Sequence, residues 1–111
     1  MKRSPESAAI YEKEWQAIID ARYHHPSIIT WVPFNEGWGQ FDTVRILNWT
    51  KQYDPTRLVD GPSGGNHVPG GDIIDHHQYP GPGAPDRVSD RAMVLGEFGG
   101  LGLPVKDHTW Q

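Results

Sequence analysis

The chain has 111 residues, a length that suits one domain built around a single hydrophobic core. Its net charge of -4 lacks the basic character of a nucleic-acid-binding surface, so we expect no nucleic-acid partner. The absence of cysteine excludes a disulfide framework and a cysteine-ligated zinc site, and no apolar run reaches the roughly 18 residues of a membrane span. We therefore expect no membrane partner. The composition does not decide the cellular compartment of the protein; a periplasmic or secreted protein is compatible with it.

Two helices are predicted in the first half of the chain. Residues 5–23 predict an amphipathic helix, with Ser4 as its cap and Pro5 in its first turn. Its apolar residues recur at three- and four-residue spacing: Ala8, Tyr11, Trp15, Ile18 and Ile19. Residues 40–53 predict a second helix, which the following "DP" ends.

Four strands are predicted. Residues 28–34 form a nearly continuous apolar run, which is typical of a parallel strand covered on both faces. Residues 57–60, 73–77 and 92–97 predict three shorter strands, and the Gly-rich stretch between the second and third strands leaves no room for a helix of normal length. Strand, helix and strand followed by two more strands is an α/β pattern, which favours a parallel sheet, either open or part of a barrel.

Two glutamates close the first and last of these strands. Glu36 lies in "PFNEGWGQ", with Asn35 and Trp38 beside it, and Glu97 lies in "VLGEFGG". The ends of parallel strands face one side of a sheet, so we expect both carboxylates on one rim, where they can divide acid and base roles. Either one alone would be an ordinary solvated or helix-capping carboxylate. A separation of about 5 Å suits double displacement at a sugar carbon and one of about 6.5 to 9.5 Å suits inversion, and sequence spacing does not choose between them.

Four motifs in order resemble a known enzyme family. "HPSIITWVPFNEGWGQ" resembles the fourth-strand motif of glycoside hydrolase family 2, the β-galactosidase and β-glucuronidase family, and "MVLGEFGG" resembles its seventh-strand motif. "DPTRLVDG" is similar to the fifth strand and "DIIDHHQYPGP" to the sixth. The resemblance implies that residues 1–111 form one partial catalytic domain: strands four to seven of a (β/α)8 TIM barrel with the preceding helix. A complete barrel takes about 250 residues, so the chain is expected to be the C-terminal half of the barrel, a fragment of a larger enzyme.

The resemblance also implies a reaction, the hydrolysis of β-glycosides by a retaining mechanism without a cofactor. Glu36 matches the general acid/base, and Asn35 matches the residue that binds the sugar 2-hydroxyl. Glu97 matches the nucleophile. His77 and Tyr79 match the polar positions of the sixth strand, with Tyr79 as the hydrogen-bond partner of the nucleophile.

Trp38 is added to this substrate site from its own chemistry, as an aromatic wall near the aglycone. The expected partner is a carbohydrate substrate, a β-glycoside. A half-barrel leaves strand edges unpaired at its fourth and seventh strands, which favours self-association. A catalytically silent carbohydrate-binding remnant is the alternative from another functional class.

A metal site was weighed against this assignment. Asp72, Asp75, His76 and His77 form a cluster of ligand-type residues, which would suit a metal-dependent hydrolase. On a strand, however, His76 and His77 point to opposite faces, and Asp75 and His77 share one. We therefore favour a polar strand end that serves a sugar site, and expect no metal.

Overall fold

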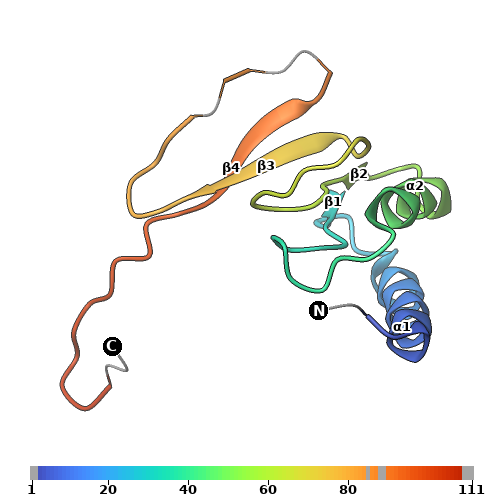
Figure 1. The fold of residues 1–111 in the computed structure, drawn as a ribbon, viewed down its shortest axis with the longest axis horizontal. Coiled ribbons are helices and arrows are strands. Elements are labelled where there is room, and N and C mark those ends of the chain that lie inside the picture. The colour runs from blue at the N-terminus through green and yellow to red at the C-terminus, as the bar shows by residue number, and fades with distance from the viewer. Residues whose placement is uncertain (1–2, 85, 88–89, 109–111) are drawn as a thin grey trace.

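The computed structural model describes residues 3–84, 86–87 and 90–108. Its elements in chain order are α1 (Pro5–Arg22), β1 (Thr30–Trp31), α2 (Thr43–Tyr53), β2 (Leu58–Val59), β3 (Ile73–Gln78) and β4 (Ala92–Phe98). In Figure 1 the two helices lie together beside the β1 and β2 pair, and the segment after β4 leads away from the strands. The described residues form a small α/β arrangement with few strands, which is not a closed barrel.

The strands run parallel in two hydrogen-bonded pairs, β1 with β2 and β3 with β4. An isolated parallel bridge between Asp60 and Ile73 joins the pairs, and a second one between Asn35 and Ser63 extends the first pair toward its carboxyl end. The order in space therefore follows the order in sequence. It brings the segment after β1 and the end of β4 to the same edge.

The helix predictions are confirmed, with one changed boundary. The helix predicted over residues 5–23 is α1, and Ser4 caps it by accepting a hydrogen bond from the Ser7 N–H at 3.1 Å. α2 begins at Thr43, three residues later than predicted, because Asp42 has a φ of 42°, a left-handed conformation that a right-handed helix does not include.

The strand predictions are confirmed in position but not in length. The strands predicted over residues 28–34 and 57–60 each pair over two residues only. Pro33 and Pro62 stand where the next ladder hydrogen bonds would form, and proline has no N–H to donate. β3 and β4 cover the predicted residues 73–77 and 92–97 and add one residue each. No helix lies between β2 and β3, as predicted.

The hydrophobic core lies between the helices and the first strand pair. Trp15 on α1 donates from Nε1 to Thr50 Oγ1 on α2 at 2.9 Å, so the helices pack side by side. The most buried apolar side chains on this side of the molecule are Ile19, Trp31, Phe34, Ile46, Leu47 and Val59. No helix in the described ranges is long and apolar enough to cross a bilayer.

A buried carboxylate ties α2 to the strands that flank it. Asp54, which follows α2, accepts hydrogen bonds from Trp31 Nε1 at 2.8 Å and from Arg57 Nη1 at 2.7 Å. Burial raises the pKa of Asp54, but hydrogen bonds from Thr56, Trp31 and Arg57 outweigh that effect and lower the pKa to about 2. The core edge therefore contains an ion pair between a fully buried carboxylate and a largely buried guanidinium.

Candidate active site

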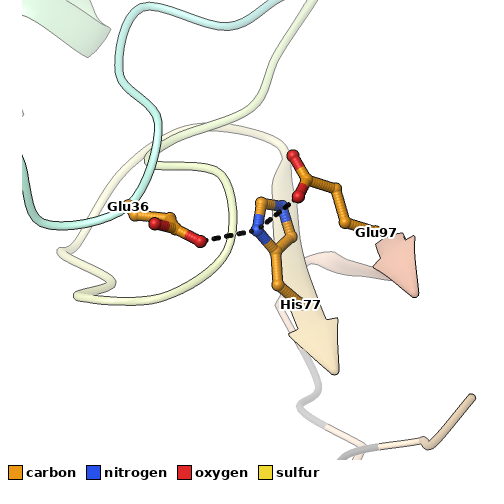
Figure 2. A group of neighbouring side chains, drawn as sticks. All are labelled: Glu36, His77 and Glu97. Carbon is orange, nitrogen blue, oxygen red and sulfur yellow. Dashed lines mark hydrogen bonds and ion pairs between the residues drawn. The ribbon is translucent and has the colours of Figure 1, made fainter. Parts of the chain in front are cut away.

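Three side chains from three elements converge at the common edge of the strands. Glu36 Oε1 lies 3.2 Å from His77 Nδ1, and Glu97 Oε2 lies 3.4 Å from the same nitrogen. One ligand-type atom from each of the three residues lies within 4.8 Å of the other two. Figure 2 shows the imidazole between the two carboxylates. The His77 side chain is 3% exposed, while those of Glu36 and Glu97 are 41% and 46% exposed, so a fixed ring lies beneath two accessible carboxylates.

The backbone at Glu36 adopts an uncommon conformation. Its φ is 53°, in the left-handed region that residues other than glycine seldom adopt. The Glu36 N–H donates to Ser63 O at 2.6 Å, and the Gln40 side-chain amide donates to the Glu36 carbonyl oxygen. Such backbone strain persists where surrounding contacts hold it and concentrates at functional sites.

A bulge in the second strand pair turns Glu97 toward His77. His76 pairs with Leu95, but His77 pairs with Glu97, so Gly96 is an extra residue in β4. Side chains alternate between the faces of a strand, and one extra residue moves the next side chain to the opposite face. In a regular ladder Gly96 would pair with His77, and Glu97 would pair with Gln78 and point away from the face that carries Asp75 and His77.

Tyr79, one residue past β3, contacts the same carboxylate. Its hydroxyl donates a hydrogen bond to Glu97 Oε2. This bond raises the pKa of Tyr79, with smaller contributions from burial and from the charges of Glu97 and Glu36. The phenol therefore stays protonated and remains a hydrogen-bond donor to the Glu97 carboxyl group.

The structure places two other predicted substrate residues at the rim. Asn35 is exposed, immediately before Glu36, and its backbone pairs with Ser63. Trp38 is 87% exposed, so its indole stands in solvent and does not pack against the triad. The triad of Glu36, His77 and Glu97, with Tyr79, is the set that the fold brings into contact.

A second layer of polar groups lies behind His77. The Ser63 hydroxyl donates to Asp75 Oδ2 at 2.8 Å and lies 2.9 Å from His77 Nε2. Asp75 is 5% exposed and also accepts from the Gly96 N–H at 2.6 Å. Asp60, at the end of β2, is 5% exposed, and burial and then the charge of Asp75 raise its pKa to about 7.

Sequence analysis missed Ser63 and Asp60. Asp60 carried a usable signal, because it ends a predicted strand just as Glu36 and Glu97 do. Ser63 lies in a Gly-rich loop, where nothing in the sequence distinguishes it from other loop residues.

The metal cluster considered from the sequence does not assemble. Asp72 accepts from Lys51 Nζ at 3.0 Å and from the Val59 N–H at 2.8 Å, while Asp75 faces Ser63 and Gly96. Asp75 and His77 share one face, as predicted, with Asp75 Oδ2 3.5 Å from His77 Nε2.

The triad also offers an imidazole nitrogen and two carboxylate oxygens, donor types that divalent cations accept. In this structure His77 Nδ1 is hydrogen-bonded to Glu36 Oε1 and lies 3.4 Å from Glu97 Oε2, to which Tyr79 donates. We therefore describe two carboxylates that approach one imidazole nitrogen. Two carboxylates this close can serve as nucleophile and proton donor on either side of a glycosidic bond, for which a separation of about 5 Å is typical of retention.

Two carboxylates at one edge of parallel strands are an arrangement typical of glycosidases. The family model described as "Glycosyl hydrolases family 2, TIM barrel domain" matches residues 1–79. The chain therefore belongs to glycoside hydrolase family 2, which confirms the resemblance seen in the motifs. The matched residues include Glu36, His77 and Tyr79 and end before Glu97.

Named relatives are β-galactosidases. The chain is 31% identical to the beta-galactosidase of Photobacterium profundum over 74 residues, which are 67% of this chain and 7% of the relative. It is 30% identical to that of Vibrio vulnificus over the same length, and 35% identical to that of Leuconostoc mesenteroides over 57 residues, 51% of this chain and 6% of the relative. The chain thus spans a small part of the length of the relatives it matches.

Proposed function

We propose that residues 1–111 are a segment of the catalytic TIM barrel of a retaining β-glycosidase, equivalent to strands four to seven with the preceding helix. The observation that carries the proposal is the approach of Glu36 and Glu97, whose nearest oxygens lie within 4.8 Å of each other on either side of His77. Membership of family 2 and the β-galactosidase relatives support a β-glycoside, galactoside-like substrate.

In the proposed reaction Glu97 is the nucleophile and Glu36 is the acid/base. The Glu97 carboxylate attacks the anomeric carbon, and Glu36 protonates the glycosidic oxygen as the bond to it breaks. A covalent glycosyl ester on Glu97 results. Glu36, now ionised, takes a proton from water, which attacks the anomeric carbon and releases the sugar and the free Glu97 carboxylate.

The neighbouring groups suit these two roles. Tyr79 donates to Glu97 and has a raised pKa, so its hydroxyl is a fixed donor to the nucleophile. His77 Nδ1 faces both carboxylates and can donate to whichever is ionised. In this proposal Asn35 hydrogen-bonds the sugar 2-hydroxyl, and Trp38 stacks on the aglycone.

The site is open on the side where further barrel strands would lie. Unpaired edges are expected at the first and last strands of the chain; β4 has seven residues and β1 only two, so β4 offers the longer edge. The 74 matched residues are 7% of the β-galactosidase relative, which supports a fragment whose substrate pocket is completed by other segments or by a second copy through the β4 edge.

Hydrolysis of a panel of nitrophenyl β-glycosides tests the proposal. We expect the galactoside to be cleaved and Glu97→Gln to abolish cleavage, while Glu14→Gln, at an exposed glutamate on α1, retains it. A 2-deoxy-2-fluoro-β-galactoside with a good leaving group should trap the intermediate. Mass spectrometry of peptides should then locate the sugar on Glu97. Label on another residue, or turnover retained in Glu97→Gln, would contradict the assignment.

A carbohydrate-binding remnant is the second candidate, favoured by the 87% exposed Trp38 beside the carboxylates. If the chain is such a remnant, calorimetry should detect galactoside binding, and Trp38→Ala should weaken that binding. The fluoro-sugar should then label no residue, and no nitrophenyl glycoside should be hydrolysed. Turnover that depends on Glu97 excludes it.

A further inference from the structure

The Ser63 hydroxyl lies between two groups that compete for its one proton. It is 2.8 Å from Asp75 Oδ2 and 2.9 Å from His77 Nε2. When the hydroxyl donates to Asp75, its oxygen can accept a hydrogen bond from His77 Nε2–H. When it donates to His77 Nε2, that nitrogen carries no proton, and Asp75 loses a donor.

The other ring nitrogen of His77, Nδ1, has only carboxylate oxygens as its hydrogen-bond partners among the described residues. Nδ1 faces Glu36 Oε1 at 3.2 Å and Glu97 Oε2 at 3.4 Å, and an ionised carboxylate only accepts hydrogen bonds. Nδ1 therefore carries the proton in either arrangement. The charge of His77 is decided at Nε2, on the side away from the glutamates.

Close packing fixes the imidazole of His77 and the carboxylate of Asp75. A Cβ at Gly64, whose φ is +79°, would lie 2.2 Å from His77 Nδ1, and a Cβ at Gly96 would lie 2.2 Å from Asp75 Oδ2. The two glycines leave the space that the imidazole and the carboxylate occupy. The Gly96 N–H also holds Asp75 Oδ1 at 2.6 Å, so both oxygens of Asp75 are engaged.

Asp60 extends the arrangement by one more carboxyl group. Both Asp60 and Asp75 are 5% exposed, and Asp60 Oδ1 has no hydrogen-bond partner among the described residues. The parallel bridge between Asp60 and Ile73 puts Asp60 on the face of Asp75, which follows Ile73 by two residues in β3. Two buried, neighbouring carboxyl groups do not both ionise readily, and a proton retained by one of them reduces the charge of the pair. Burial and the charge of Asp75 accordingly raise the pKa of Asp60 to about 7.

We propose that Asp60, Asp75 and Ser63 form a buried relay that positions the imidazole of His77 and sets its charge. With Asp75 ionised and Asp60 protonated, the Ser63 proton points to Asp75 and His77 carries both ring protons. Three positioning residues, none in contact with the solvent-facing side of the site, then place a cation between Glu36 and Glu97.

Other ionisable groups surround the relay. On the first strand pair they are Glu36, after β1, and His67, in the loop after β2, with Arg91 near His67. On the second strand pair they are His76 in β3, Tyr79 just after β3, and Glu97 in β4. Burial lowers the pKa of His67, with a further lowering by Arg91 and His76, so His67 adds little positive charge near Asp75 at neutral pH. The relay carboxyl groups and the two glutamates are the charges that bear on His77.

Nuclear magnetic resonance of the whole chain labelled with 15N-histidine tests this proposal. Long-range spectra report the protonation of each ring nitrogen, and the chain has only six histidines. His77→Gln assigns the His77 signals. We expect both His77 nitrogens to be protonated at mildly acid pH, and a titration in two coupled steps because Asp60 loses its proton in the same range.

Asp75→Asn should lower the pH at which His77 loses its Nε2 proton by about one unit, a tenfold change in proton affinity, since the neighbouring charge is removed. Ser63→Ala should also lower the pH at which His77 loses its Nε2 proton. Ser63→Thr, which keeps the hydroxyl, should leave that pH as in the unsubstituted chain. In Asp60→Asn the titration of His77 should show one step instead of two. Asp72→Asn is the matched control, because Asp72 bonds Lys51 and Val59 instead of the relay.

An unchanged His77 titration in folded Asp75→Asn and Ser63→Ala would overturn the proposal, and so would a single-step curve in the unsubstituted chain. If Asp75→Asn does not fold, the Ser63→Ala and Ser63→Thr pair decides alone. The relay bears on catalysis only through the proposed glycosidase function. Its test, however, reads a ring nitrogen and no turnover, so failure of the relay and failure of the glycosidase assignment are distinguishable.

Discussion

His77 and Glu97 face each other across β3 and β4 because β4 contains one extra residue, Gly96, at their bulge. A Cβ at Gly96 would lie 2.2 Å from Asp75 Oδ2, so we expect Gly96→Ala to lower the free energy of unfolding by about 1 to 3 kcal/mol. Gly102→Ala is the control, since a Cβ there meets no atom within 4 Å, and should change stability by less than about 0.5 kcal/mol. Urea unfolding measures both. Equal effects would contradict the steric argument.

Tyr79→Phe should reduce turnover without unfolding the chain. The substitution removes the hydroxyl that donates to Glu97 Oε2 and leaves the ring in place. Loss of one donor to a reacting carboxylate lowers kcat by about 10- to 100-fold. Steady-state kinetics on the nitrophenyl glycoside that the chain cleaves measures the effect, with Tyr53→Phe, at a tyrosine between the helices, as the control. A loss shared by both variants would point to general damage.

Glu36→Gln should be sensitive to the leaving group. If Glu36 protonates the departing oxygen, its loss slows glycosides with poor, basic leaving groups strongly, and slows nitrophenyl glycosides less, since those leave without protonation. The measurement is kcat/KM across a series of aryl β-glycosides of graded leaving-group pKa. We expect kcat/KM to fall more steeply with leaving-group pKa in Glu36→Gln than in the unsubstituted chain. An unchanged slope would count against the acid role.

Asp60→Asn should change how stability depends on pH. The pKa of Asp60 is raised to about 7 in the folded chain, from an ordinary value of 3.8, by burial and by the charge of Asp75. Between these pH values the folded state binds more protons than the unfolded state, so this group's contribution is full at about pH 4 and is lost as pH rises through about 7. The slope is at most about 1.4 kcal/mol per pH unit.

Urea unfolding at pH 4.5 to 8 compares the chain with Asp60→Asn. The substituted chain should lose this descending component and otherwise follow the same profile. The low pKa of Asp54, about 2, acts at more acid pH and does not overlap this range. A profile unaltered by Asp60→Asn would rule out a raised pKa at this residue.

Two ion pairs with different burial should differ in how much they contribute to the free energy of unfolding. Asp54 is fully buried and Arg57 is 10% exposed by side chain, so Asp54→Ala leaves a buried guanidinium unpaired and should cost about 3 to 5 kcal/mol. Arg45 pairs with Glu12 on the surface, with side chains 50% and 42% exposed, and Arg45→Ala should cost less than about 1 kcal/mol. Thermal or urea unfolding distinguishes the two, and similar costs would contradict the burial argument.

The hydrophobic pattern was sufficient to predict both helices, all four strands and the parallel arrangement, because helix and strand periodicities are local properties. It was not sufficient for strand length. The prolines that interrupt pairing, Pro33 and Pro62, act on a partner strand about 30 residues away, and strand register is not encoded locally.

The meeting of Glu36 with Glu97 could be predicted from their strand-end positions and the family motifs. The role of Gly96 could not, because a bulge shows itself only once two strands are aligned. Ser63 was equally hidden, since a loop serine becomes significant through the Asp75 and His77 side chains that it joins.

The short junction between the strand pairs has a further consequence. Glu36 follows β1 and Glu97 lies in β4, so their separation depends on the bridge from Asp60 to Ile73 and on the neighbouring hydrogen bond from the Asp72 N–H to Val59 O at 2.7 Å. The spacing of the carboxylates thus depends on the junction between the two strand pairs and not on either pair alone. A change at that junction can part Glu36 from Glu97 while each pair of strands stays intact, so amide hydrogen exchange there should report the integrity of the site more faithfully than the melting temperature of the whole chain.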